Sequence, residues 1–183
     1  MKTTREKKKI GLFGSVKAMT MAAMLTAMSV VIGIFCKSLL NFGGGLFRIT
    51  FENMPILIAG IMFGPIVGGV VGAATDVISY FLSGQAYPIN ILVTLGATSI
   101  GLISGLLSKY VFKKSGYLRI IVPSAAAHVV GSMIIKPIGL FAFYGFAVFW
   151  RIPMYLVIAP LEIAMICLMY RNSTVRKLLD GGF

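Results

Sequence analysis

Long apolar runs separated by short polar segments occupy most of this chain of 183 residues, of which 58% are hydrophobic and 12% charged. Soluble domains carry about 25% charged residues, and about 20 apolar residues in a helix cross the hydrocarbon core of a bilayer. The runs lie at residues 15–36, 50–63, 66–82, 89–110, 120–143 and 152–170. They predict an all-α integral membrane protein, a six-transmembrane-helix bundle without room for a soluble catalytic domain.

The basic residues indicate how this bundle is oriented. The net charge is +12, and the cations cluster in an arm at residues 1–14, in a loop near residues 109–119 and in a tail at residues 172–183. With both termini in the cytoplasm, all but four of the 17 Lys and Arg residues lie on the inner side or near it, as the positive-inside rule requires. We therefore expect an N-terminal arm, a transmembrane domain at residues 15–171 and a cytoplasmic tail, and no nucleic-acid partner.

Four cations fall on the outer side of this topology: Lys37, Arg48, Lys136 and Arg151. A single such residue commonly extends its charge to the lipid headgroups, and this alternative stands for each of them. Lys136 lies inside the fifth run and precedes Pro137, where a kink frees backbone carbonyls and the headgroups are harder to reach. Together the four indicate an outward-facing pocket of positive potential, suited to an anionic ligand.

The few acidic residues and the histidine allow structural and functional interpretations. Asp76 either pairs with an outer cation or accepts hydrogen bonds from a ligand with adjacent N–H donors. Glu52 begins the second run, where the helix dipole favours a carboxylate, and Glu162 is expected to pair within the bundle. His128 has no second His or Cys near it in the sequence, so we expect a hydrogen-bonded packing residue, no metal site and no cofactor.

Small residues recur at helical spacing in two places. The glycines at positions 60, 64, 68, 69 and 72 predict helices packed backbone to backbone. Ala18, Ala22, Ala23 and Ala27 form a strip on the first run, and such a strip serves either packing inside the bundle or docking to another membrane subunit. Three successive glycines, 43–45, cannot hold a helix and predict a mobile loop.

Motifs of several protein classes are missing from the sequence. It contains no phosphate-binding loop, no HExxH and no acidic pair at catalytic spacing, so we expect a chain that is not an enzyme. A membrane-embedded enzyme acting on a lipid or prenyl group remains an alternative, but five acids and one histidine supply few catalytic groups. A small channel or exporter is a third class, and it would show polar residues along a whole helix face.

Several segments resemble the substrate-binding (S) subunits of energy-coupling factor (ECF) vitamin transporters. The general features are six short spans, a basic arm and the Ala23-xxx-Ala27 spacing. Residues 46–55 (LFRITFENMP), 59–68 (AGIMFGPIVG), 72–76 (GAATD) and 151–153 (RIP) resemble the folate-type S subunits. Several S-subunit types share FGPIVG and GAxxD, so riboflavin, thiamin and pantothenate are alternatives, whereas Arg48 and the Arg151 segment favour folate.

The resemblance implies a multi-pass protein of the bacterial plasma membrane that captures folate from outside and is driven by a membrane scaffold subunit with two cytoplasmic ATPases. The alanine strip would then dock on the scaffold subunit, and the loop at residues 41–46 would cover the site. Asp76 would accept hydrogen bonds from the pterin, while Arg48, Arg151 and Lys136 would receive the carboxylates. Aromatic side chains would cover the faces of the ligand, namely those of Phe42, Phe51, Tyr87 and Trp150.

Overall fold

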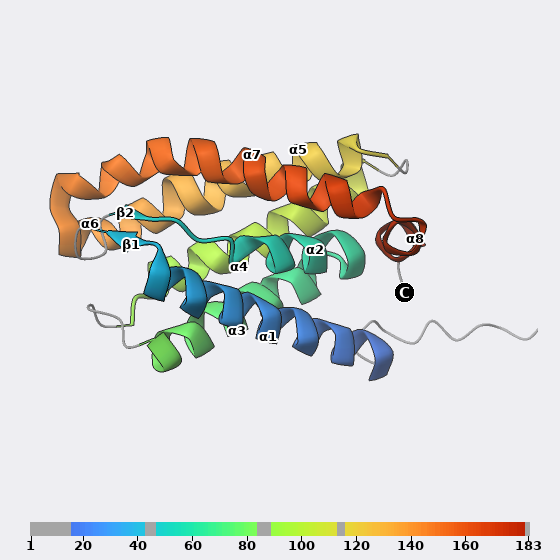
Figure 1. Ribbon diagram of the computed structural model, residues 1–183, viewed down its shortest axis with the longest axis horizontal. Coiled ribbons are helices and arrows are strands. Elements are labelled where there is room, and N and C mark those ends of the chain that lie inside the picture. The colour runs from blue at the N-terminus through green and yellow to red at the C-terminus, as the bar shows by residue number, and fades with distance from the viewer. Residues whose placement is uncertain (1–15, 43–46, 84–88, 113–115, 182–183) are drawn as a thin grey trace, which may run out of the picture.

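The protein is a bundle of helices, and the computed structural model describes residues 16–42, 47–83, 89–112 and 116–181 (Figure 1). The α-helices are α1 (Val16–Leu39), α2 (Asn53–Phe63), α3 (Pro65–Ser83), α4 (Ile91–Leu106), α5 (Leu118–Ala127), α6 (Lys136–Tyr144), α7 (Arg151–Tyr170) and α8 (Ser173–Gly181). Two π-helical segments (Leu107–Val111 and His128–Ile135) extend α4 and join α5 to α6. Two short strands, β1 (Asn41–Phe42) and β2 (Phe47–Arg48), pair antiparallel between α1 and α2. The prediction of a helical, apolar fold is confirmed.

Four helical stretches of the described chain are long and apolar enough to cross a membrane: Val16–Leu39, Pro65–Ser83, Ile91–Val111 and Leu118–Tyr170. The last has 53 residues and folds back on itself, because α7 returns beside α5 and α6 (Figure 1). The reversal is a 3-10 helical turn, Gly145–Trp150. It begins at Gly145 with φ 56°, a conformation that glycine adopts without strain.

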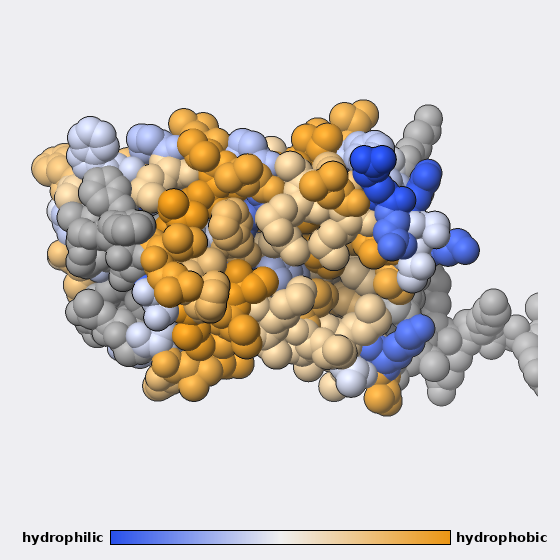
Figure 2. Space-filling view, in the orientation of Figure 1, coloured by the Kyte–Doolittle hydropathy of each residue, from blue (hydrophilic) through white to orange (hydrophobic). Residues whose placement is uncertain are grey.

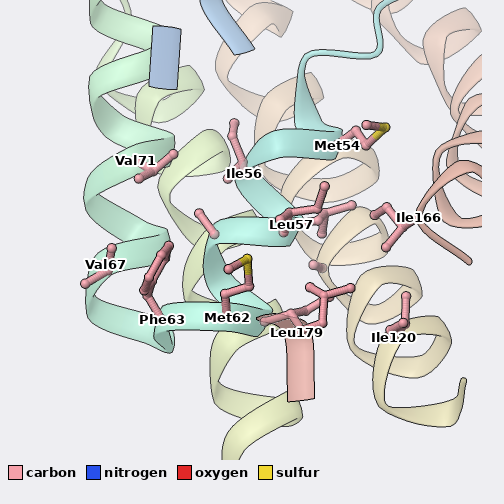
Figure 3. Close-up of a cluster of buried hydrophobic side chains, with 14 of the residues drawn as sticks. Met54, Ile56, Leu57, Met62, Phe63, Val67, Val71, Ile120, Ile166 and Leu179 are labelled. Carbon is pink, nitrogen blue, oxygen red and sulfur yellow. The ribbon is translucent and has the colours of Figure 1, made fainter. Parts of the chain in front are cut away.

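Helix α2 is the centre of the packed core. It has 11 residues, all of them buried, and at 1.5 Å per residue it is about 16 Å long, roughly half the thickness of a hydrocarbon core. Figure 3 shows its side chains meeting those of the surrounding helices, Val71 of α3, Ile166 of α7 and Leu179 of α8 among them. The short second run therefore forms an internal helix with neighbours on every side.

Helices α3 and α4 cross in backbone contact. A Cβ atom added at Gly68 of α3 would lie 2.5 Å from the carbonyl oxygen of Gly101 in α4 and 2.6 Å from the Cα of Gly60 in α2. Only glycine permits this approach, because no real Cβ contact is that short. The prediction of backbone-to-backbone packing from the glycine spacing is confirmed here.

The C-terminal segment, expected as a tail, forms helix α8 and packs on the bundle. Leu179 is buried, and the Asp180 carboxylate accepts a hydrogen bond of 2.7 Å from the Tyr170 hydroxyl and lies 3.5 Å from the Arg119 guanidinium. The beginning of α1 and the end of α8 lie at the same end of the bundle (Figure 1). On the face that Figure 2 shows, hydrophilic residues gather at that end and hydrophobic residues cover the middle.

Candidate functional site

Three charged side chains from three helices meet inside the bundle, and we call them the Lys37–Glu52–Lys136 triad. The Lys37 Nζ at the end of α1 lies 3.9 Å from Glu52 Oε2, and the Lys136 Nζ at the start of α6 lies 3.8 Å from Glu52 Oε1. The side chains are 11%, 13% and 7% exposed for Lys37, Glu52 and Lys136. Glu52 is the N-cap residue of α2, but its carboxylate makes no capping hydrogen bond and faces the two ammonium groups instead.

One face of α1 holds Glu52 in this position. Ser29, Gly33 and Lys37 are spaced four residues apart and therefore share a helix face. The Ser29 hydroxyl donates to the backbone carbonyl of Glu52. A Cβ at Gly33 would lie only 2.6 Å from Glu52 Oε2, so the absence of a side chain there leaves room for the carboxylate. Lys37 then supplies the charge, and its ammonium also donates to the Ser83 hydroxyl at 3.3 Å.

Lys136 reaches the triad across α4. Its stem passes over Gly96, where a Cβ would lie 2.6 Å from Lys136 Cγ. Its ammonium donates to Asn53 Oδ1 at 3.2 Å, and the whole residue is 6% exposed. Lys136 thus points into the bundle, and the alternative that it extends to the lipid headgroups does not apply in this structure.

Asp76 lies half-buried on α3 and faces α4. The Thr94 hydroxyl donates to Asp76 Oδ2 at 2.7 Å, and Asn90, the N-cap residue of α4, lies one turn before Thr94. The Thr94 contact was not expected from the sequence. It holds the carboxylate against α4 and occupies one of the about four acceptor positions on its two oxygens.

Buried polar atoms near these charges lack hydrogen-bond partners within the described part of the chain. They are the Asn53 amide nitrogen, the Thr75 hydroxyl and the Ser79 hydroxyl. Thr75 and Ser79 share a face of α3 with Ser83, the acceptor of the Lys37 hydrogen bond. Buried polar groups are normally satisfied, so an unsatisfied set indicates a place for water or a polar ligand.

The aromatic and arginine residues around α7 differ in exposure. Arg151, at the start of α7, is 7% exposed, and its guanidinium lies 5.3 Å from the centroid of the Tyr144 ring. Phe51 is half-buried and precedes Glu52. Trp150 is 66% exposed, so this structure does not bring its ring into the buried cluster.

Three further residues expected in the site are placed only partly or not at all. The backbones of Phe42 and Arg48 lie in β1 and β2, where Phe42 pairs with Phe47 and Arg48 with Asn41. Tyr87 lies outside the described residues. The roles of their side chains stay predictions.

His128 and Glu162 form a separate pair between the π-helical segment and α7. The His128 Nε2 lies 2.8 Å from Glu162 Oε2, and both side chains are fully buried. The Ser132 hydroxyl lies 3.4 Å from His128 Nδ1. The predictions of a packing histidine and of a Glu162 partner inside the bundle are confirmed, and the two are partners of each other.

The alanine strip lines a groove between α1 and α3. The groove has a volume of about 620 Å³, and its walls include Ala18, Ala22, Ala23 and Ala27 on one side and Val67, Val71 and Ala74 on the other. Ala23 and Ala27 are exposed, whereas Ala18 is buried. The buried Ala18 therefore belongs to the packed part of the bundle, whereas Ala23 and Ala27 form an exposed apolar surface.

Sequence reasoning missed the role of Glu52 and of Lys37 as its partner. Lys136 and Asn53 are 83 positions apart, and no periodicity connects them. The available signal was the spacing of Ser29, Gly33 and Lys37, which marks a polar face on an otherwise apolar helix. Chemically, the buried cations suit carboxylates, and Asp76 with the unsatisfied hydroxyls suits a neutral polar ring.

Similar proteins were found by family, by sequence and by structure. The family described as ECF transporter, substrate-specific component matches residues 17–179. An uncharacterized protein, the MG098 homolog of Mycoplasma pneumoniae, is 34% identical over 90 residues, which cover 49% of this chain and 18% of that protein. The chain thus spans less than a fifth of that relative. The crystal structure of FolT bound with folic acid is similar with a TM-score of 0.65 at 24% identity, over 82% of this chain and 90% of that one.

Proposed function

The chain belongs to the family of ECF transporter substrate-specific components, and we propose that it is a membrane-embedded folate-binding subunit of an ATP-driven vitamin uptake system. It captures folate at the extracellular face of the bacterial plasma membrane. A membrane scaffold subunit and two cytoplasmic ATPases supply the energy. The similar fold of FolT, which binds folic acid, favours folate over riboflavin, thiamin or pantothenate as the ligand.

The observation that carries this proposal is the buried charge of the bundle. Within the described residues, Lys37 and Lys136 are about nine-tenths buried or more and both face the Glu52 carboxylate, while Arg151 is 7% exposed. Burying an ionisable group in a membrane protein costs several kcal/mol, so such groups mark functional sites by default. A ligand with two carboxylates and a polar ring would neutralise the two lysines and supply partners to the Thr75 and Ser79 hydroxyls, which have none within the described part of the chain.

The roles of individual residues follow from their chemistry. Asp76 accepts hydrogen bonds from adjacent N–H groups of the pterin, with Thr94 holding its second oxygen. Arg48, Arg151 and Lys136 receive the carboxylates, since arginine suits bidentate contact. Phe42, Phe51, Tyr87 and Trp150 cover the aromatic faces, and for the exposed Trp150 this requires its ring to turn inward when folate binds.

The topology of the proposal has six spans with both termini in the cytoplasm. The spans are α1, the short α2, α3, α4, the α5–α6 leg and α7. This arrangement places the basic residues near α8 inside, in agreement with the positive-inside rule. The open end of the groove at Ala23 and Ala27 is then the docking surface for the scaffold subunit.

The experiment that tests this function is folate uptake by cells without an uptake system of their own. Cells that express this chain together with an ECF scaffold subunit and its ATPases should accumulate labelled folic acid. Cells that express the chain alone should bind folic acid without accumulating it. Accumulation by the chain alone, or accumulation of riboflavin in place of folic acid, would contradict the proposal.

A further inference from the structure

We propose that Lys37 and Lys136 form a carboxylate-binding subsite, and that Glu52 is their internal counter-ion, which competes with a ligand carboxylate for the two ammonium groups. This inference rests on the proposed function in that it assigns the subsite for the anionic part of the ligand. It adds Lys37, with Glu52 as its counter-ion, to the residues assigned to the carboxylates, which were Arg48, Arg151 and Lys136.

The charge of the triad is the first argument. Two ammonium groups face one carboxylate, which leaves a net charge of +1 among three side chains that are each at most 13% exposed. A buried charge without full compensation is unfavourable. A ligand carboxylate neutralises the triad, so binding relieves a cost that the unliganded protein carries.

The distances supply the second argument. Charge-assisted hydrogen bonds between ammonium and carboxylate are about 2.7–2.9 Å long, whereas the contacts to Glu52 are 3.8 and 3.9 Å. Each ammonium has three donors, and within the described chain each makes one hydrogen bond, Lys37 to Ser83 and Lys136 to Asn53. Both lysines are thus positioned by neutral acceptors while donors remain for a carboxylate.

The surroundings of Glu52 supply the third argument. Its backbone carbonyl accepts a hydrogen bond from the Ser29 hydroxyl, and its carboxylate rests against Gly33. The start of α2 is thus fixed through its backbone, and Gly33 leaves the room that the carboxylate occupies beside the lysines. A larger residue at position 33 would displace the same carboxylate, because its Cβ would lie 2.6 Å from Glu52 Oε2.

The test uses glutarate, a dicarboxylate without a pterin, and its neutral diamide glutaramide as the matched probe. The purified full chain in detergent is unfolded by heat at increasing probe concentration, and the shift of the midpoint gives an apparent Kd. We expect glutarate to stabilise the wild type and glutaramide to have no effect. Lys136→Gln and Lys37→Gln should each weaken glutarate binding about tenfold or more.

Glu52→Gln separates this proposal from a purely structural role. It should tighten glutarate binding about tenfold, because the competing charge is gone while the lysines stay. Gly33→Ala should also tighten glutarate binding, because its methyl group would displace the Glu52 carboxylate from the lysines. This variant replaces Glu52→Gln in the test if Glu52→Gln does not fold. Glu162→Gln is the matched control, since it removes a buried carboxylate from the pair with His128 and should leave glutarate binding unchanged.

Three results would overturn the proposal: equal stabilisation by glutarate and glutaramide, no stabilisation by either, or weaker glutarate binding by Glu52→Gln than by the wild type. The outcome is independent of folate recognition. A chain that shows the glutarate pattern but binds no folic acid retains the subsite and disproves the folate function. A chain that binds folic acid but is stabilised equally by glutarate and glutaramide, or by neither, retains the folate function and disproves the subsite.

Discussion

At the scale of single residues, the carboxylate of Asp76 is the most specific element of the candidate site. The Thr94 hydroxyl donates a hydrogen bond to it, and that bond survives if the carboxylate becomes an amide whose oxygen still accepts. The negative charge and one acceptor oxygen are then lost, and these are what a pterin with adjacent donors requires. A substitution at position 76 should therefore weaken ligand binding without changing the stability of the fold.

We predict that Asp76→Asn weakens folic acid binding by about 10- to 100-fold, because a hydrogen bond to a charged group contributes roughly 1.5–3 kcal/mol. The thermal midpoint without ligand should change little. Isothermal titration of the purified variant measures the affinity, with Asp180→Asn at the opposite end of the bundle as the control for charge. An Asp76→Asn variant with unchanged affinity would remove Asp76 from the site.

The His128–Glu162 pair illustrates the opposite case, a buried polar pair that serves the fold. Both side chains are fully buried, so removing one leaves the other without compensation. We predict that Glu162→Ala destabilises the protein by about 3–5 kcal/mol. The double variant His128→Phe/Glu162→Leu should be more stable than the single one, because apolar replacement of both partners avoids the unpaired group. Thermal midpoints in detergent check the order, and a double variant no more stable than Glu162→Ala would contradict it.

At the scale of helices, the crossing of α3 and α4 depends on the absence of side chains. We predict that Gly68→Ala destabilises the bundle by roughly 1–3 kcal/mol or more, because the new methyl group would meet backbone atoms of Gly101 and Gly60. Gly69→Ala is the matched control, since its Cβ would meet the movable Leu102 side chain, at 2.9 Å. Thermal midpoints of the two variants measure the difference. Equal destabilisation would mean that backbone contact is not what holds the crossing.

Helix α8 contributes to stability through one buried leucine. Leu179 is 2% exposed and packs beside α2, so we predict that Leu179→Ala costs about 2–5 kcal/mol. Lys177→Ala, on the exposed face of the same helix, should have little effect. Limited proteolysis of the C-terminal segment checks this, since Leu179→Ala should be cut faster than either Lys177→Ala or the wild type. Similar cutting rates for the two variants would show that α8 is not held by its leucine.

At the scale of the whole molecule, the helices, their approximate bounds and the glycine contacts could be predicted from the sequence because they depend on local periodicity. That His128 packs inside the bundle and that Glu162 has a partner there could also be predicted, but not that the two are partners of each other. The triad could not be predicted, since it joins α1, α2 and α6 through residues up to 99 positions apart (136 minus 37). Helix α8 was missed because its single buried face is short and lies next to several basic residues.

The proposed function depends on the identity of the ligand, which equilibrium binding by the purified full chain measures. Folic acid, riboflavin, thiamin and pantothenate are titrated under the same conditions. We expect folic acid to bind with submicromolar affinity and the other three vitamins not to displace it. Folic acid binding weaker than micromolar, with tight binding of one of the other vitamins, would contradict the proposed function.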